Sequence, residues 1–143
     1  MTTQLQALEL WRTALVASVR SAAPDLSARQ MGLLLCVYLG DGPHTVRGLS
    51  KTLKISKPAI SRALDRLGEL GYIRRERDDL DRRNVIVQRT PDGGRYLLDY
   101  AALIEEAQKH IKTIPDTAQL DFALQVLSAP LSAMPPERPA IAA

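Results

Sequence analysis

The sequence predicts a mainly α-helical fold that carries a small β element of two or three strands. Two observations lead to this prediction. Apolar residues recur at steps of three and four over most of the chain, which is the period of a helix buried along one face. The stretch from about 72 to 89 departs from that period, because two short strand-like runs there flank a cluster of charged residues.

The composition indicates one soluble domain. The 143 residues are 45% hydrophobic and 24% charged, which are ordinary globular values and enough for a core without disulfides or metal ions. The single cysteine, Cys36, excludes a disulfide within the chain and suits a reducing compartment. No secretory signal pattern opens the sequence, and no stretch approaches the ~18–20 apolar residues of a membrane helix. We therefore expect a cytoplasmic protein without a membrane partner.

Positive charge is concentrated in the middle of the chain. Residues 45–89 contain twelve Lys/Arg against six Asp/Glu, whereas the remainder contains seven against ten. A basic segment between mildly acidic ends is typical of a region that meets a polyanion such as nucleic acid. Chance clustering of surface lysines and arginines is the alternative, and charge alone does not separate the two.

Two helices are predicted before the basic segment. Apolar residues at helical spacing predict an amphipathic helix over residues 4–22, which Pro24 ends. Ser27 is the predicted N-cap of a second helix that runs to about Leu39. Its run "MGLLLCVYL" is apolar on nearly all sides, so we expect this helix to be buried.

The basic segment begins with two helices joined by a tight turn. The breaker "GDGP" is followed by Thr45, which caps a short helix. After the turn "KIS", Ser56 caps a second helix that ends at Gly71, with Pro58 in the first turn, where its missing N–H costs nothing. The apolar positions that we expect to face the core are Ile60, Ala63, Leu64 and Leu67.

A hairpin and two further helices complete the predicted fold. Residues 72–77 and 84–89 are predicted strands. The charged cluster "ERDDLDRR" is the loop that joins them. Thr90 as N-cap and Pro91 as the first helical residue start a helix to about Lys112. A last short helix follows, to about residue 127.

This order of elements is that of a winged helix-turn-helix. Two helices joined at a steep angle by a short turn let the second project from the surface, where it can enter the major groove of B-DNA. Lysines and arginines near the start of such a helix reach phosphates and base edges together. An ordinary solvated helix face is the alternative. The predicted recognition residues are Ser56, Lys57, Pro58, Ser61, Arg62 and Arg66, of which Lys57, Ser61 and Arg62 are expected to read bases.

The charged cluster is then the tip of the hairpin, the wing. A wing beside a groove needs arginine to enter or bridge the minor groove, where negative potential is strongest. We predict Arg77, Arg82 and Arg83 as the wing residues. Acidic neighbours shape the tip in this hypothesis, because Asp81 or Asp78 holds Arg83 while Arg82 is left to face DNA.

At this point the sequence resembles the MarR family of bacterial transcription regulators. The segments that carry the resemblance are "LSARQMGLLLCVYL" and "LSKTLKISKPAISRALDRLGELGYIRRERDDLDRRNVIVQRTPDGGRYL", within roughly residues 26–98. Its most specific part is Asp81-x-Arg83 followed seven residues later by Thr90, after a "LxxLxxxGYI" helix exit. The family usually has leucine just before the Thr90 position, where this chain has Arg89.

The resemblance implies a homodimer in which the terminal helices interleave and two winged regions read a palindrome. The implied division is residues 1–25 and 91–128 for dimerisation, 26–90 for DNA binding, and 129–143 for a Pro/Ala-rich tail that we expect to be disordered. Packing of the terminal stripes within one chain is the alternative to partner packing. The N-terminal stripe consists of Leu5, Leu8, Trp11, Leu15 and Val19.

We therefore predict a sequence-specific DNA-binding transcriptional regulator, a repressor that binds double-stranded DNA at a palindromic promoter site as a homodimer. An architectural DNA-binding protein with little sequence preference and a protein-binding winged module are the alternatives. Glycine-rich phosphate loops, nucleophile elbows and paired carboxylates in apolar settings are not found in the sequence, so we expect neither catalysis nor a cofactor.

Three further features have simple interpretations. Cys36 lies in an apolar helix, where an inert buried thiol is expected, although some relatives in the family sense oxidants through a cysteine. His44 and His110 are isolated, without carboxylates at ligand spacing, so no metal site is expected. An unidentified small-molecule ligand is a possible partner, as for relatives that bind phenolic compounds. Core packing is nevertheless the expected role of the aromatic candidates Trp11, Tyr38 and Tyr100.

Overall fold

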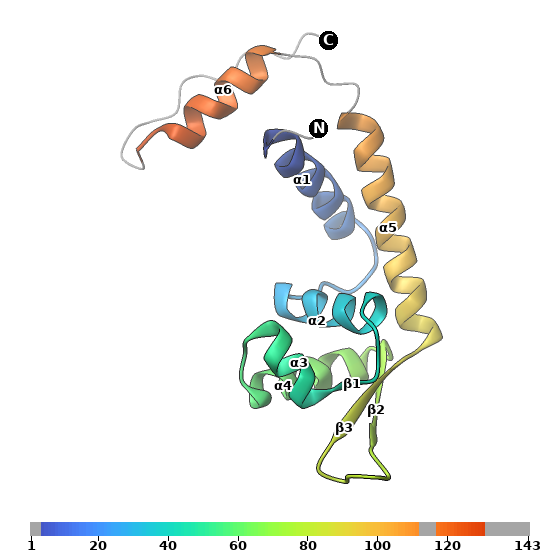
Figure 1. Ribbon diagram of the computed structural model, residues 1–143. Helices are drawn as coiled ribbons and strands as arrows, with labels where there is room; N and C mark the ends of the chain where they lie inside the picture. The colour runs from blue at the N-terminus through green and yellow to red at the C-terminus, as the bar shows by residue number, and fades with distance from the viewer. Residues whose placement is uncertain (1–3, 112–116, 131–143) are drawn as a thin grey trace. The chain divides into compact units, whose positions relative to one another are not determined.

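A computed structural model describes residues 4–111 and 117–130 of the chain. The elements, in order, are α1 (Gln4–Arg20), α2 (Ala28–Leu39), β1 (His44–Thr45), α3 (Val46–Leu53), α4 (Lys57–Glu69), β2 (Ile73–Arg77), β3 (Val85–Arg89), α5 (Pro91–Ile111) and α6 (Thr117–Ser128) (Figure 1). The predicted mainly helical fold with a small sheet is confirmed. The chain divides into two compact units, residues 18–101 and residues 1–17 with 102–143.

The core of the 18–101 unit forms between α2 and the two helices of the basic segment. All four apolar positions predicted on α4 are buried, and three of them are fully enclosed. Leu33, Leu34 and Val37 of α2 are enclosed as well. The prediction that α2 is buried on nearly all sides is wrong, because Leu39 is 80% exposed and Leu35 is 38% exposed. An apolar helix packs only along the faces that neighbouring elements cover.

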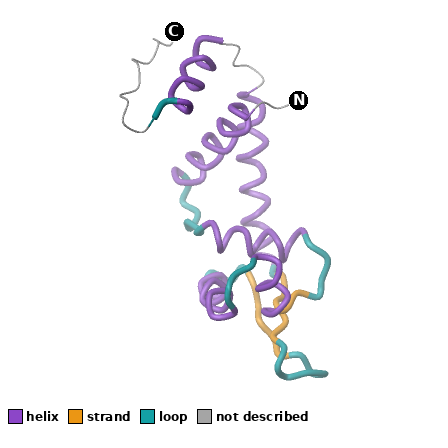
Figure 2. Tube along the Cα trace, turned by 60° about the vertical axis from the view of Figure 1, so that its left-hand side comes forward, coloured by secondary structure: helices purple, strands orange, loops and turns teal. Residues whose placement is uncertain are grey.

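A three-stranded antiparallel sheet lies beside these helices, in the order β1-β3-β2. In the hairpin, Ile73 pairs with Arg89 at the root and Arg77 pairs with Val85 near the tip. The two-residue strand β1 pairs with β3 on its other edge, with His44 opposite Val87. Figure 2 shows the hairpin as two orange strands closed by a teal loop, which is the predicted wing.

Side-chain caps fix where the helices of the 18–101 unit begin. The Ser27 hydroxyl accepts a hydrogen bond from Gln30 N at 3.2 Å, and Ser27 N donates to Gln30 Oε1 at 2.8 Å, which is a reciprocal capping box. Thr45 caps α3 and Ser56 caps α4, as predicted. Gly71 follows α4 with φ +77°, a left-handed conformation that favours glycine.

The remaining boundaries differ from prediction by a few residues. Helix α1 ends at Arg20 rather than near residue 22, and the predicted end of α5 near Lys112 lies outside the described residues. The expected disordered tail falls almost wholly on residues 131–143, which lie outside the described residues. None of the described helices combines the length and the apolar character that a bilayer crossing requires.

Candidate nucleic-acid interface

Helix α4 has one buried and one exposed face. Its apolar residues enter the core, so the remaining positions point to solvent. Lys57, Pro58, Arg62 and Arg66 are exposed, and Ser61 is half-buried at the edge of the face. The Ser56 hydroxyl accepts a hydrogen bond from Ala59 N at 3.3 Å, so it serves first as the helix cap. The predicted recognition residues therefore lie along one exposed surface, whose upstream end is a helix N-terminus.

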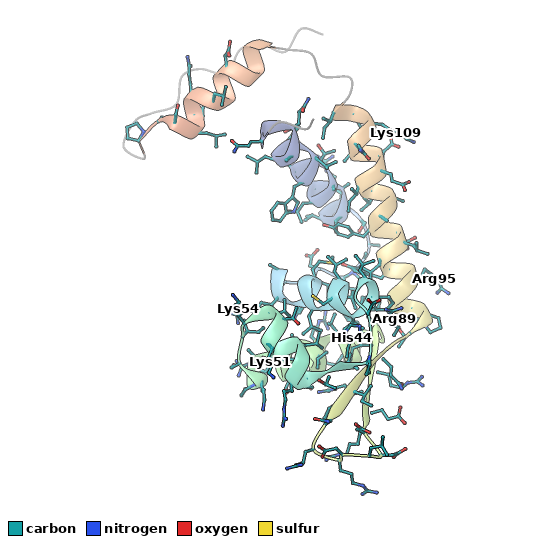
Figure 3. All side chains as sticks on the ribbon, viewed as in Figure 1. His44, Lys51, Lys54, Arg89, Arg95 and Lys109 are labelled. Atoms are coloured by element: carbon teal, nitrogen blue, oxygen red, sulfur yellow. The ribbon has the colours of Figure 1, made fainter. Side chains whose placement is uncertain are left out.

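Helix α3 adds a second row of cations, which was not predicted from the sequence. Arg47 and Lys51 are exposed, and their spacing of four residues places them on one side of the helix. Lys54, in the turn that follows α3, is exposed as well, and Figure 3 labels it together with Lys51. The opposite side carries Leu49, which is buried. The spacing of Arg47 and Lys51 is visible in the sequence and could have predicted this row.

Lys54 occupies a strained position in the turn between α3 and α4. Its φ of 54° and ψ of 41° are left-handed, which costs an L-residue with a Cβ roughly 1–2 kcal/mol. The Lys54 amide donates to Ser50 O, and the Ser50 hydroxyl donates to Ile55 O at 2.5 Å. These bonds hold the turn tight and fix the start of α4.

The wing is shaped by hydrogen bonds within its own loop. Asp81 Oδ1 accepts from the backbone N of Arg83 at 3.1 Å and from its Nε at 3.2 Å. Asp78 Oδ1 accepts from Leu80 N at 2.9 Å, so this carboxylate folds the loop and does not hold Arg83. Of the two predicted arrangements, the structure contains the one with Asp81.

The wing arginines differ in how they are engaged. Arg77 Nη1 donates to the carbonyl oxygen of Arg82 at 3.1 Å, so Arg77 contributes to the shape of the loop. The Arg82 side chain is exposed, and within the described part of the chain no acidic side chain pairs with it. Arg83 remains largely accessible, with its side chain 86% exposed despite the pair with Asp81. Two guanidinium groups are therefore presented at the tip.

An ion pair links the wing to the recognition helix. Arg75 Nη2 of β2 lies 2.6 Å from Asp65 Oδ1 of α4. Asp65 belongs to the exposed face of α4, so the hairpin borders the same surface as the predicted recognition residues. An exposed pair of this kind contributes at most about 1 kcal/mol, but it defines the side of α4 on which the wing lies.

Cys36, three aromatic residues and the possible metal ligands were candidates for roles other than DNA binding. Cys36 is half-buried rather than fully buried, and it lines a pocket of about 300 Å³ together with His44 and Thr52. Tyr38 and Tyr100 pack against the core, whereas Trp11 is 64% exposed. Within residues 4–111 and 117–130, no group of three His, Cys, Asp or Glu side chains could hold a metal ion.

Comparison with known proteins agrees with this geometry. Residues 25–84 match the model of the MarR family. The winged region is thus similar to the MarR family over these residues. The match includes α2, the helix-turn-helix and most of the wing, so the resemblance predicted from the sequence is confirmed. The comparison with curated proteins found no match.

Solved structures share the MarR-type fold over most of the chain. A MarR-family transcriptional regulator from Rhodococcus sp. RHA1 is 26% identical, with 87% of this chain and 86% of that chain aligned at a TM-score of 0.55. A mutant of S. aureus MepR bound to an oligodeoxyribonucleotide is 17% identical, covering 87% and 89% at a TM-score of 0.66. The regulator Tm0710 from Thermotoga maritima is 20% identical, covering 86% and 81% at a TM-score of 0.59.

Proposed function

We propose that this chain is a sequence-specific regulator of transcription that binds double-stranded DNA through α4 and the wing. The observation that carries the proposal is the exposed basic face of α4, which carries Lys57, Arg62 and Arg66 and borders the wing. The Arg75–Asp65 pair at 2.6 Å keeps the hairpin beside that surface. The solved MepR relative bound to an oligodeoxyribonucleotide supports DNA as the ligand of this fold.

The residues divide by the part of the duplex that they meet. Lys57, Ser61 and Arg62 enter the major groove with α4, where side-chain donors and acceptors read base edges. Arg66 and the α3 row meet phosphates, because the first helix of such a motif crosses the backbone. Arg82 and Arg83 bridge the adjacent minor groove, and Asp81 with Asp78 shapes the loop that presents them.

We further propose that the protein acts as a homodimer on a palindromic promoter site and represses by blocking access to it. Helix α1 has large exposed apolar side chains. A contiguous apolar patch of this kind on a soluble protein is typical of a protein–protein interface. Leu8 is 51% exposed, Trp11 64%, Leu15 46% and Val19 65%. Residues 1–25 and 91–128 are accordingly the proposed dimerisation helices, and 26–90 the DNA-binding region.

Salt-dependent binding tests this proposal. A duplex selected by the wild-type protein from a random pool is titrated at several salt concentrations. Lys51→Ala or Arg82→Ala removes one phosphate contact from each protomer, hence two from the homodimer, and lowers the magnitude of the log–log slope by about 1.8, which is about 0.9 for each contact. Arg62→Ala costs roughly 1–3 kcal/mol and relaxes base preference at one position of each half-site. Arg95, exposed on α5 outside this surface, provides the control Arg95→Ala, for which the slope is unchanged.

Each alternative function has its own result in the same experiment. Equal affinity for the selected duplex and bulk DNA at fixed salt contradicts sequence-specific regulation and identifies an architectural DNA-binding protein. Absence of duplex binding at low salt contradicts DNA binding altogether and favours a winged module that meets an acidic protein.

A further inference from the structure

The root of the wing is fastened by the hydroxyl of one tyrosine. Tyr38, near the end of α2, accepts a hydrogen bond from Thr90 N at 2.8 Å. Its hydroxyl oxygen also lies 2.8 Å from the carbonyl oxygen of Tyr72 and 2.9 Å from that of Thr90, so its single proton is donated to one of them at a time. Tyr72 immediately precedes β2, and Thr90 immediately follows β3. One hydroxyl therefore contacts both ends of the hairpin.

A second fastening is made by Arg89, the last residue of β3. Arg89 Nε donates to Val37 O at 2.8 Å, and its Nη2 donates to Gly40 O at 3.0 Å. These carbonyls lie at the C-terminal end of α2, where a cation is favoured. The guanidinium carbon also lies 5.9 Å from the centre of the Tyr38 ring. Figure 3 shows Arg89 where β3 passes α2 and α5 begins.

The backbone at this junction is joined by further hydrogen bonds and approaches Tyr38 closely at Gly93. The Thr90 hydroxyl donates to Gly71 O at 2.6 Å and accepts from Gly93 N at 3.1 Å, which ties the end of α4 to the start of α5. A Cβ at Gly93 would overlap the Tyr38 hydroxyl and the Tyr72 carbonyl oxygen. The ends of α2, α4 and the hairpin thus meet within one tightly packed network.

We propose that Tyr38 and Arg89 are positioning residues for DNA binding: they touch no DNA, but they set the direction in which the wing projects. The inference rests on the proposed function. Each hairpin strand has five residues, which is about 16 Å of chain, so a rotation of roughly 10° at the root moves the tip by about 3 Å. That displacement is enough to remove a guanidinium from a groove. Among the side-chain hydrogen bonds of the described residues, those of Tyr38 and Arg89 are the ones that join α2 to the hairpin root.

The inference predicts coupling between the root and the tip. Tyr38→Phe removes the hydroxyl but keeps the ring, and it should weaken binding of the selected duplex about tenfold. In that background Arg82→Ala should cause less than half of its usual loss on a logarithmic scale, because the wing is already misplaced. Arg62→Ala, on α4, should retain its full effect. A role confined to overall stability would leave all three effects additive.

Arg89→Met provides a second and milder variant, because this side chain is exposed and its loss leaves no cavity. It should show the same non-additivity with Arg82→Ala, whereas Arg95→Met, which removes an equal charge from α5, should not. Amide hydrogen exchange over residues 85–90 should accelerate in Tyr38→Phe and in Arg89→Met, while exchange in α4 stays at the wild-type rate. Circular dichroism of each variant is the control for folding.

The outcomes separate this inference from the proposed function. If the wild-type protein binds no duplex, the proposed function is wrong and this inference falls with it. If the wild type binds but both root variants are additive with Arg82→Ala, the positioning role alone is refuted. Unchanged exchange over residues 85–90 would refute it as well.

Discussion

Tyr96 is the one tyrosine of the four whose side chain is buried, at 8% exposure. Its ring stacks on Tyr72 with centroids 4.6 Å apart and lies 6.4 Å from Tyr100. Burial, reinforced by the neighbouring Tyr72, Tyr100 and Asp25, raises the pKa of Tyr96 from 10.0 to about 12. The neutral phenol is therefore part of the native packing of α5.

This pKa predicts a loss of stability in alkali. Above pH 10 the unfolded chain releases the Tyr96 proton while the native chain retains it, so the stability present below pH 10 declines as the pH rises toward 12. Tyr96→Phe should show a shallower decline over this range than the wild type. Denaturant midpoints measured from about pH 8 to about pH 11.5 test this, and parallel curves for the two proteins would contradict it.

Two adjacent glycines make a matched pair at the same scale. A Cβ at Gly94 would lie 3.8 Å from Tyr38 Cε1, which is ordinary contact, whereas one at Gly93 overlaps oxygen atoms. Gly94→Ala should therefore stabilise α5 by about 0.5–1 kcal/mol, and Gly93→Ala should destabilise the protein by more than about 1 kcal/mol. Thermal unfolding of both variants tests the difference. Equal changes in stability for the two variants would show that the structure around Gly93 adjusts to a Cβ at little cost.

At the scale of elements, α2 determines how the rest of the 18–101 unit is assembled. Its N-terminus is closed by Ser27 and Gln30, its middle carries the core, and its C-terminus is bound by Arg89. The helix is thus satisfied at both ends, where backbone groups would otherwise need water.

The capping box gives a quantitative prediction for this helix. Ser27→Ala leaves Gln30 N without its acceptor and should lower the free energy of unfolding by about 1 kcal/mol. Arg29→Ala, an exposed position in the same turn, should change it by less than about 0.5 kcal/mol. Urea denaturation of the two variants checks this. An unchanged free energy of unfolding in Ser27→Ala would contradict the prediction, because water would then replace the Ser27 hydroxyl fully as the acceptor for Gln30 N.

At the scale of the whole molecule, the exposed apolar side chains of α1 bear on the oligomeric state. Trp11 is the sole tryptophan of the chain and reports directly on this surface. If α1 packs on a partner, Trp11 emission shifts to shorter wavelength as protein concentration rises. Leu8→Glu with Leu15→Glu should give a monomer in sedimentation and abolish the shift. Leu80→Glu, at a wing-tip residue that is 98% exposed, is the matched control and should leave the dimer intact. A monomeric wild type at all concentrations would contradict the proposed homodimer.

The fold was largely predictable because local patterns determine it. The spacing of Ile60, Ala63, Leu64 and Leu67 predicted the buried face of α4, and the caps Ser27, Thr45 and Ser56 predicted where helices begin. The exposure of Leu39 was not predictable, because apolarity alone does not show which faces of a helix have neighbours. A third strand was allowed by the prediction, but the position of β1 was not predicted, because two residues form a strand only through their pairing with β3.

The site was predictable in part. The Asp81–Arg83 pair could be anticipated because its members lie two residues apart. The α3 cations were visible at helical spacing and were overlooked. The hydrogen bonds of Tyr38 and Arg89 could not be predicted from the sequence, because their partners lie 34 to 52 residues away along the chain. Arg89, at which this chain departs from the family pattern, thus binds the end of α2.

The left-handed backbone of Lys54 implies a compromise between thermal stability and affinity for DNA. Glycine at this position would remove the backbone cost of roughly 1–2 kcal/mol, and the entropy that glycine loses on folding offsets only part of that gain. Lys54→Gly should therefore melt at a higher temperature than the wild type and bind DNA less tightly. Calorimetry and a duplex titration on the same sample would reveal both effects. Such an outcome would mean that the turn gives up some resistance to heat in order to keep an ammonium group beside the start of α4.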